Sequence, residues 1–159
     1  MNFVTAIRAL IDAQVDFVVV GGWSAIIHGS SYMTQDLDLC FSRNRENLKR
    51  LANALAPFHP RLRDFPAELP FIWDDATLNS GTVFTLSTDL GVIDLLAEIA
   101  GVGDFADVKA HSVLVDAFET KVFTLDLPTL IRAKRAAGRP KDLQVLPELE
   151  SLADASDSE

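Results

Sequence analysis

A short apolar run that ends in two glycines constrains this chain more than any other part of its sequence. Residues 17–20 read Phe-Val-Val-Val and are followed directly by Gly21 and Gly22. An uninterrupted run of β-branched and aromatic residues is typical of a strand that is covered on both faces. The residues from Trp23 to His28 then predict a short helix, which Gly29 ends. The pattern therefore predicts a buried strand, a glycine turn and a helix in close succession.

Periodicity and capping residues predict the other elements. Asn2, Asn44 and Asp126 can each cap a helix, and Gly138 can end one. Helices are accordingly predicted over roughly 1–13, 44–56 and 126–137, and again from Pro140 onward, where Pro147 would bend or split the helix. Four prolines predict a loop over 57–70. Strands are predicted over 37–41, 71–73, 82–87, 91–96, 112–115 and 121–124.

These elements predict an α/β (α+β) fold, in which helices flank a mixed sheet and a helical extension follows. We expect one domain over residues 1–152 and an acidic, disordered tail over 153–159. The chain has 159 residues, of which 48% are hydrophobic, and this is enough to form a core without disulfides. Its one cysteine, Cys40, has no second cysteine to pair with.

The charge balance limits the classes of partner. The formal net charge is −9, from 14 basic and 23 acidic residues. Extended nucleic-acid binding and membrane-surface binding both need a basic face, so this balance argues against them. No apolar stretch is long enough to span a membrane, and the first residues do not resemble a secretion signal. We therefore expect a cytoplasmic protein without a membrane partner.

Two aspartates on one predicted strand indicate a metal site. Asp36 and Asp38 are two residues apart, so their side chains point to the same face of the strand. Asp94 is a single acid within the apolar run 91–96, and it is the best candidate for a third carboxylate. Carboxylate oxygens suit Mg²⁺ or Mn²⁺, especially where substrate phosphates complete the coordination shell. The alternatives are a solvated strand face for the pair and an ion-paired acid for Asp94.

The glycine turn is a candidate phosphate site. Gly21 and Gly22 lie where a predicted strand meets a predicted helix, and such a junction exposes backbone N–H groups and the positive end of the helix dipole. Ser24 could donate a hydroxyl hydrogen bond to the same phosphate. The alternatives are an ordinary tight turn for the glycines and a capping role for Ser24.

Together these motifs resemble the nucleotidyltransferases of the DNA polymerase β superfamily, in particular small bacterial members of the toxin–antitoxin and abortive-infection kind. The resemblance rests on Gly21-Gly22, on His28-Gly29 and on the block Thr34-Gln35-Asp36-Leu37-Asp38. A basic block near the C-terminus, Lys134 to Asp142 with Gly138-Arg139-Pro140-Lys141-Asp142, is similar to a segment that many of these proteins carry. The similarity covers residues from about 16 to 150.

This resemblance implies a function and a set of site residues. It implies transfer of a nucleoside monophosphate from a nucleoside triphosphate to a hydroxyl group on a protein, a tRNA end or a small molecule. Asp36, Asp38 and Asp94 would hold Mg²⁺ or Mn²⁺ and act in catalysis. The nucleotide would be bound by Gly21, Gly22, Ser24, Lys134, Arg139 and Lys141. The alternative for the basic residues is a solvated helix face.

Two departures from the family pattern keep a second function open. Relatives often carry an arginine shortly before the acidic pair, where this chain has Ser30-Ser31-Tyr32-Met33, and Trp23 stands where some relatives have serine. In this alternative, the chain is a nucleotide-binding module without catalysis that acts through a partner protein, as one half of a toxin–antitoxin pair. A nucleic-acid binder built on the basic block is the weakest alternative, because that block is small. The three histidines share no zinc-ligand spacing.

Overall fold

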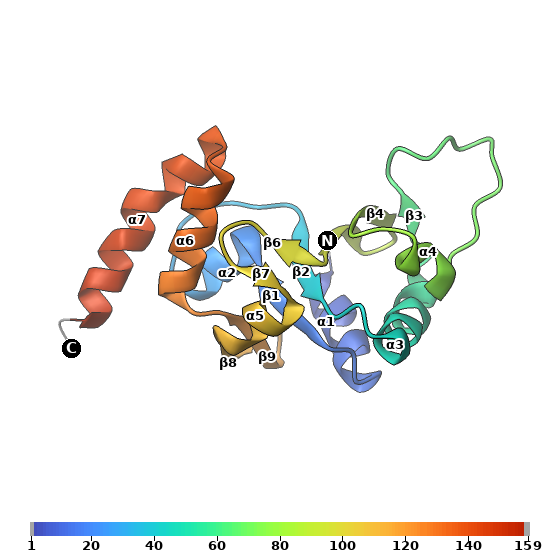
Figure 1. Cartoon of the computed structure of the whole chain (residues 1–159), viewed down its shortest axis with the longest axis horizontal. Helices are drawn as coiled ribbons and strands as arrows, with labels where there is room; N and C mark the ends of the chain where they lie inside the picture. Colours follow the sequence, from blue (N-terminus) through green and yellow to red (C-terminus); the bar gives the residue numbers. More distant parts are fainter. Residues whose placement is uncertain (1, 158–159) are drawn as a thin grey trace.

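A seven-stranded mixed sheet with helices on both faces forms the centre of the molecule (Figure 1). In this computed structural model, residues 2–157 are described. The sheet has the strand order β3-β4-β5-β2-β1-β9-β8, and β6 and β7 form a separate hairpin. The elements are α1 (Phe3–Asp12), β1 (Phe17–Val20), α2 (Gly21–Ile27), β2 (Leu37–Phe41), α3 (Arg45–Leu55), the 3₁₀ turn η1 (Ala56–Phe58), β3 (Arg61–Leu62), α4 (Asp75–Asn79), β4 (Val83–Thr88), β5 (Gly91–Leu96), β6 (Glu98–Ile99), β7 (Gly103–Asp104), α5 (Phe105–Ala110), β8 (Ser112–Ala117), β9 (Thr120–Leu125), α6 (Leu127–Ala137) and α7 (Pro140–Asp157).

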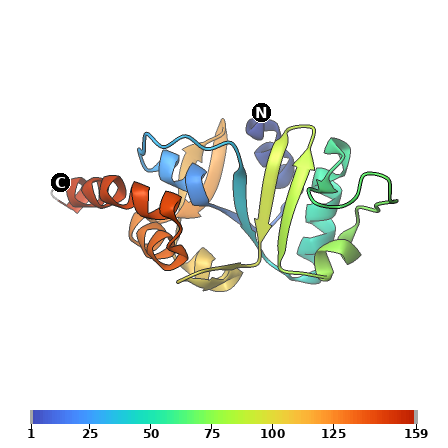
Figure 2. The same cartoon turned by 90° about the horizontal axis from the view of Figure 1, so that it is seen from above.

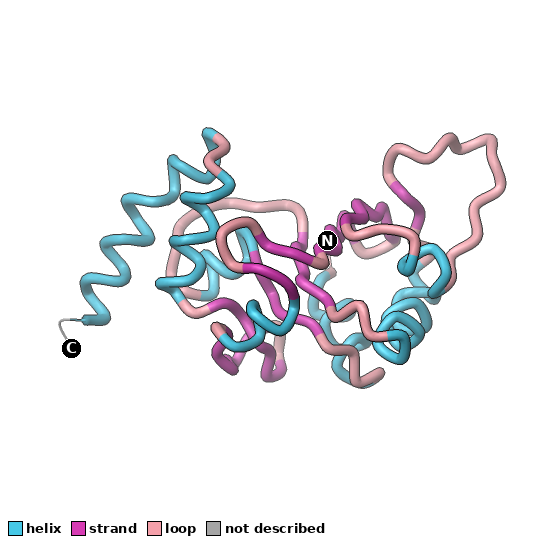
Figure 3. Tube along the Cα trace, in the orientation of Figure 1, coloured by secondary structure: helices cyan, strands magenta, loops and turns pink. Residues whose placement is uncertain are grey.

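The helices form two layers, and each layer packs on one face of the sheet (Figures 2 and 3). One layer contains α1 and α3, whose apolar side chains meet the inward residues of the central strands, among them Leu37, Leu39, Leu86, Ile93 and Leu95. The other layer contains α2, α5, α6 and α7, which cover Val18, Val20 and Leu125. Figure 2 shows α6 and α7 on one side of the strands and α3 on the other. The central strand β1 is therefore buried on both faces, as its sequence predicts.

The capped helices predicted from sequence are confirmed. The side chains of Asn2, Asn44 and Asp126 each accept a hydrogen bond from a backbone N–H in the first turn of the helix that follows. Gly138 ends α6 in the left-handed conformation, with φ at 65°. The predicted strand over 37–41 coincides with β2.

Two short helices, α4 and α5, were not predicted from the sequence. Residues 71–73 are not a strand; they lead into α4, where the Asp74 side chain accepts a hydrogen bond from the Thr77 N–H. The sequence prediction also missed α5, which begins with a reciprocal capping box between Asp104 and Asp107. Both helices are too short to produce an apolar periodicity, so only their caps mark them in the sequence.

The C-terminal helix is longer than predicted. It passes through Pro147 as a single helix and extends to Asp157, so residues 153–157 are helical rather than a disordered tail. Leu149 is fully buried, and Leu152 and Ala153 pack against the apolar cluster that α2, α5 and α6 form on this face of the sheet. These contacts hold this part of the helix against the rest of the protein. Residues 158–159 of the predicted tail lie outside the described residues. Over residues 2–157, the structure contains no helix with the length and apolarity needed to cross a membrane.

Candidate active site

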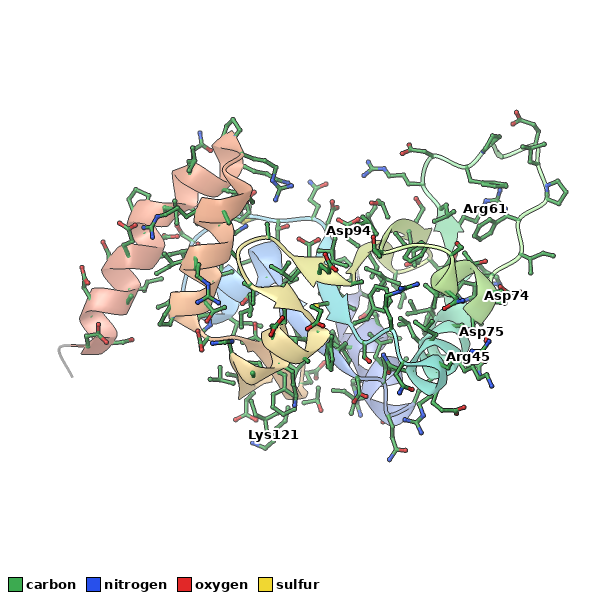
Figure 4. All side chains as sticks on the ribbon, in the orientation of Figure 1. Arg45, Arg61, Asp74, Asp75, Asp94 and Lys121 are labelled. Carbon is green, nitrogen blue, oxygen red and sulfur yellow. The ribbon has the colours of Figure 1, made fainter. Side chains whose placement is uncertain are left out.

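The register of the sheet brings the two predicted acidic segments together. Asp38 on β2 lies directly opposite Asp94 on β5, with Val20 of β1 and Thr85 of β4 as the next residues on either side. These residues share one face of the sheet, because the Leu37 and Leu39 side chains occupy the opposite face in the core. Both aspartates line a cavity of about 350 Å³. Asp94 lies at the centre of the molecule (Figure 4).

The environment of Asp38 disfavours its charged form. Burial, a hydrogen bond with Asp94 and the nearby charges of Asp94 and Asp36 raise the pKa of Asp38 to about 7, against a weaker opposing effect of Lys134. The Oδ1 atom of Asp94 is buried and has no hydrogen-bond partner among the described residues. Two adjacent carboxylates repel one another, and the buried Asp94 Oδ1 atom has no described partner, so a proton or a cation between them would stabilise the site.

The glycine turn allows the chain to pass very close to Asp38. Gly21 has φ at +66°, and a Cβ atom there would lie 2.1 Å from the Asp38 Oδ2 atom. At Gly22, a Cβ atom would lie 2.8 Å from the Cβ of Thr34. Only glycine fits both the backbone conformation and the space at position 21. Gly21 lines the cavity, whereas Gly22 packs against Thr34, which precedes the acidic pair.

The opposite wall of the cavity is basic and is organised by a buried carboxylate. Lys134 and Arg139 line the cavity together with Asp142, whose side chain is fully buried. Asp142 accepts a hydrogen bond from the Lys134 Nζ at 3.3 Å and from the Arg139 Nε at 2.6 Å. Burial alone would raise the pKa of Asp142, but these bonds and the two positive charges lower it. Both cations are therefore held by one anion that faces away from solvent.

Asp142 is a site residue that the sequence prediction missed. Its sequence signals are the spacing of three residues after Arg139 and of eight after Lys134, which place all three at the junction of α6 and α7. In the sequence, Asp142 is only the last residue of the basic block, and no role is predicted for it. The burial of Asp142 beneath two cations depends on the angle between the two helices, which no local pattern specifies.

The other predicted site residues lie outside the cavity lining. Asp36 is half-buried just before β2, where its charge contributes to the raised pKa of Asp38. Ser24 is fully buried, and its hydroxyl hydrogen-bonds with Thr124 at 2.7 Å, so it supports the junction of α2 and β9 rather than facing a phosphate. Lys141 is exposed at the start of α7. The structure thus brings together Gly21, Asp38, Asp94, Lys134 and Arg139.

Side chains hold the loop before the acidic pair in place. Ser30 and Ser31 both bind the Glu148 carboxylate of α7, and the Ser31 hydroxyl donates to it at 2.7 Å. The hydrogen bonds from the Ser30 hydroxyl, and then those from Ser31, lower the pKa of Glu148. This segment connects the loop before the acidic pair to the C-terminal helix.

The two carboxylates suit a magnesium ion whose remaining ligands come from a substrate and from water. Within residues 2–157, no three His, Cys, Asp or Glu side chains form a ready-made metal cluster. Mg²⁺ is usually held by one or two carboxylates while water and substrate phosphates fill the remaining positions. Asp38 and Asp94 supply such a pair, and the unpartnered Oδ1 atom of Asp94 is an available ligand. The donor set therefore fits Mg²⁺ bound together with a nucleotide.

Solved structures with the same fold are nucleotidyltransferases or resemble them. A protein of Thermotoga maritima described as a candidate nucleotidyltransferase is 16% identical, with a TM-score of 0.57 over 94% of this chain and 92% of that one. The antibiotic-resistance factor ANT(2″)-Ia is 18% identical, with a TM-score of 0.52 over 98% and 85%. An antigenic nucleotidyltransferase-like protein of Paracoccidioides brasiliensis is 15% identical, with a TM-score of 0.52 over 95% and 74%.

The fold predicted from the sequence motifs is confirmed. The chain has the nucleotidyltransferase fold, with its mixed sheet, flanking helices and C-terminal helical extension. No protein-family model matches the chain. No curated protein matches it either.

Proposed function

We propose that this protein is a magnesium-dependent nucleotidyltransferase that moves a nucleoside monophosphate from a nucleoside triphosphate to a hydroxyl acceptor. One observation supports this most strongly. Asp38 and Asp94, paired across two parallel strands, face Lys134 and Arg139 across one cavity beside Gly21. A triphosphate is bound by positive side chains and by a metal that carboxylates hold, and this cavity has two cations and the carboxylates that would hold the metal.

In the proposed complex, the triphosphate lies between the glycine turn and α6. Lys134 and Arg139 contact its phosphates, and the open backbone at Gly21 lets the phosphates approach Asp38 closely. Asp36 does not line the cavity, but its negative charge lies near Asp38 at the edge of the site. Lys141, which is exposed, would reach a phosphate only from outside the cavity.

The chemistry is an in-line displacement at the α-phosphorus. The acceptor oxygen forms the new P–O bond, the bond to the bridging oxygen breaks, and pyrophosphate leaves. Asp94 is placed to receive the acceptor proton, because its carboxyl group lines the cavity beside Asp38. When bound, Mg²⁺ would neutralise phosphate charge and orient the phosphates. The residues themselves supply positioning and a fixed electrostatic environment, which contribute most to such reactions.

A nucleotide-binding module without turnover is the second candidate. The observation that favours it is the loop before the acidic pair, where Ser30 and Ser31 bind Glu148 and no arginine is present. Such a module would act through a partner protein, as one component of a toxin–antitoxin pair.

The experiment measures nucleotide binding and turnover separately. Calorimetry with ATP, GTP, CTP and UTP, each with and without Mg²⁺, tests binding. Labelled nucleoside triphosphates incubated with the protein and possible acceptors test transfer. The variants are the double substitution Asp36→Asn with Asp38→Asn and the single substitution Asp94→Asn, with Asp116→Asn on the far edge strand as control. Transfer that survives in the acidic-pair variants would refute the metal assignment, and binding without turnover in the native protein would favour the module.

A further inference from the structure

A second groove adjoins the active-site cavity on the side of β4. It has a volume of about 390 Å³ and lies between β4 and the segment that follows β3, residues 62–66. Val83 and Thr85 line both the cavity and this groove. Figure 4 shows Asp94 and Arg61 on either side of β4 in that view. A ligand in the groove would therefore lie beside a bound nucleotide rather than in its place.

The sheet register continues the row of site residues into this groove. Thr85 is opposite Asp94, and the Arg63 N–H donates to the Thr85 carbonyl at 2.9 Å. Leu62 pairs with the core residue Leu86, so its neighbours Arg61 and Arg63 lie on the acidic face of the sheet. From one strand to the next, the row runs from Asp38 through Asp94 and Thr85 to Arg63.

The groove combines positive charge with aromatic rings. Arg63 is exposed, and in the described part of the chain it has no carboxylate within ion-pair distance. The Arg61 guanidinium lies 6.0 Å from the Phe65 ring centroid and 5.4 Å from that of Phe71, and its Nη2 atom is buried without a described hydrogen-bond partner. The charged residues that line the groove are Arg63 and Asp64, and Arg61 lies beside it against Phe65. Guanidinium groups beside aromatic rings suit a ligand that carries both a phosphate and a planar base.

The direction of attack places the acceptor on this side. In the proposed complex, the triphosphate lies between the glycine turn and α6, at the β1 end of the row. In phosphoryl transfer the attacking and leaving oxygens lie roughly in line, so the acceptor hydroxyl approaches from the opposite end. That end is β4 and β3, with Asp94 between the two ligands.

We propose that the groove between β4 and residues 62–66 binds the acceptor, and that Arg63 selects an acceptor whose hydroxyl belongs to a nucleotide. This inference rests on the proposed function. The nucleotide phosphate binds Arg63 and its base lies against Phe65. Its ribose oxygen attacks the α-phosphorus, pyrophosphate leaves with the bridging oxygen, and the hydroxyl proton passes to Asp94 and then to solvent. A free nucleotide and the 3′ end of an RNA strand present the same chemistry.

The test compares acceptors with and without a phosphate. Transfer from α-labelled nucleoside triphosphate with Mg²⁺ is measured to adenosine, to adenosine monophosphate and to a short RNA with a free 3′ hydroxyl. We expect kcat/KM to be at least about tenfold higher for a phosphate-bearing acceptor than for adenosine, as a charge-assisted contact provides. Arg63→Ala should bring this ratio close to one, and Arg63→Lys should restore part of it. Arg45→Ala on α3 removes the same charge away from the groove and should leave the ratio unchanged (Figure 4).

The outcomes separate the two proposals. Better use of the RNA than of the mononucleotide identifies a strand end as the acceptor, and the reverse identifies a free nucleotide. Equal use of adenosine and adenosine monophosphate, or a ratio that persists in Arg63→Ala, overturns the assignment of the groove. Pyrophosphate release without transfer to any of the three acceptors also overturns it, while the proposed function stands. Absence of both nucleotide binding and pyrophosphate release overturns the proposed function itself.

Discussion

Replacing Asp38 with asparagine should change how the stability of the metal-free protein depends on pH. Burial and the adjacent Asp94 raise the pKa of Asp38 from 3.8 to about 7 in the folded protein. Between these pH values the folded state holds a proton that the unfolded state has lost, so the free energy of unfolding falls as the pH rises. At about 1.4 kcal/mol per pH unit, the full effect is about 4 kcal/mol, of which between 2 and 3 kcal/mol, roughly, develops between pH 5 and pH 8.

Asparagine does not ionise, so the free energy of unfolding of the variant should not fall in this way as the pH rises. Urea unfolding of both proteins in EDTA, at pH 5 and at pH 8, measures the difference in unfolding free energy. We expect the variant to gain about 2–3 kcal/mol relative to the native protein between the two pH values. Comparing the two pH values removes any constant effect of the substitution. Asp64→Asn, at an exposed carboxylate, should show no such gain. A difference that stays constant, or that shrinks as the pH rises, would refute the raised pKa of Asp38 in the folded protein.

Four further outcomes follow from the site. Mg²⁺ with a nucleoside triphosphate should raise the melting temperature of the native protein, EDTA should reverse the increase, and Asp38→Asn should abolish it. Gly21→Ala should lower both stability and nucleotide affinity, measured by melting and calorimetry, because its Cβ would lie 2.1 Å from the Asp38 Oδ2 atom. Asp142→Asn should destabilise the protein by about 3–5 kcal/mol and weaken nucleotide binding, because Lys134 would lose its buried charged partner, whereas Lys141→Ala should change neither. Glu148→Ala should speed amide exchange at Ser31 without changing the rate in the core strands, and equal rates in both proteins would argue against the loop contact.

Local features of the sequence were sufficient to predict much of the fold. Asn44 and Asp126 mark helix starts, and alternation along 37–41 separates the buried leucines from Asp38. The acidic pair and the glycine turn led to the correct fold family, because their spacing follows from one strand-turn-helix-strand unit. The Trp73 indole N–H donates to the Ala52 carbonyl, and the side chain packs against the core.

Most contacts between distant segments could not be predicted. The sequence predicts that Asp94 joins the acidic pair, but its register opposite Asp38 depends on β5 lying next to β2, although β3 and β4 come between them in the sequence. Ser24 follows the glycines like a phosphate ligand, yet its hydroxyl oxygen accepts a hydrogen bond from Thr124, which is a hundred residues away. Arg63 lies in a proline-rich loop, and only the sheet register connects it to the row of site residues.

The two faces of β2 make folding and chemistry depend on the same alignment. Leu37, Leu39 and Phe41 fill the core from one side of this strand, while Asp38 reaches the cavity from the other. Sliding β2 by one residue would move the leucines out of the core and Asp38 into it, at a large cost in unfolding free energy. The packing of the leucines in the hydrophobic core thus fixes the position of the Asp38 carboxylate along the strand. Insertions and deletions can therefore accumulate in the loops around β2, whereas a single inserted residue within the strand would remove stability and activity together.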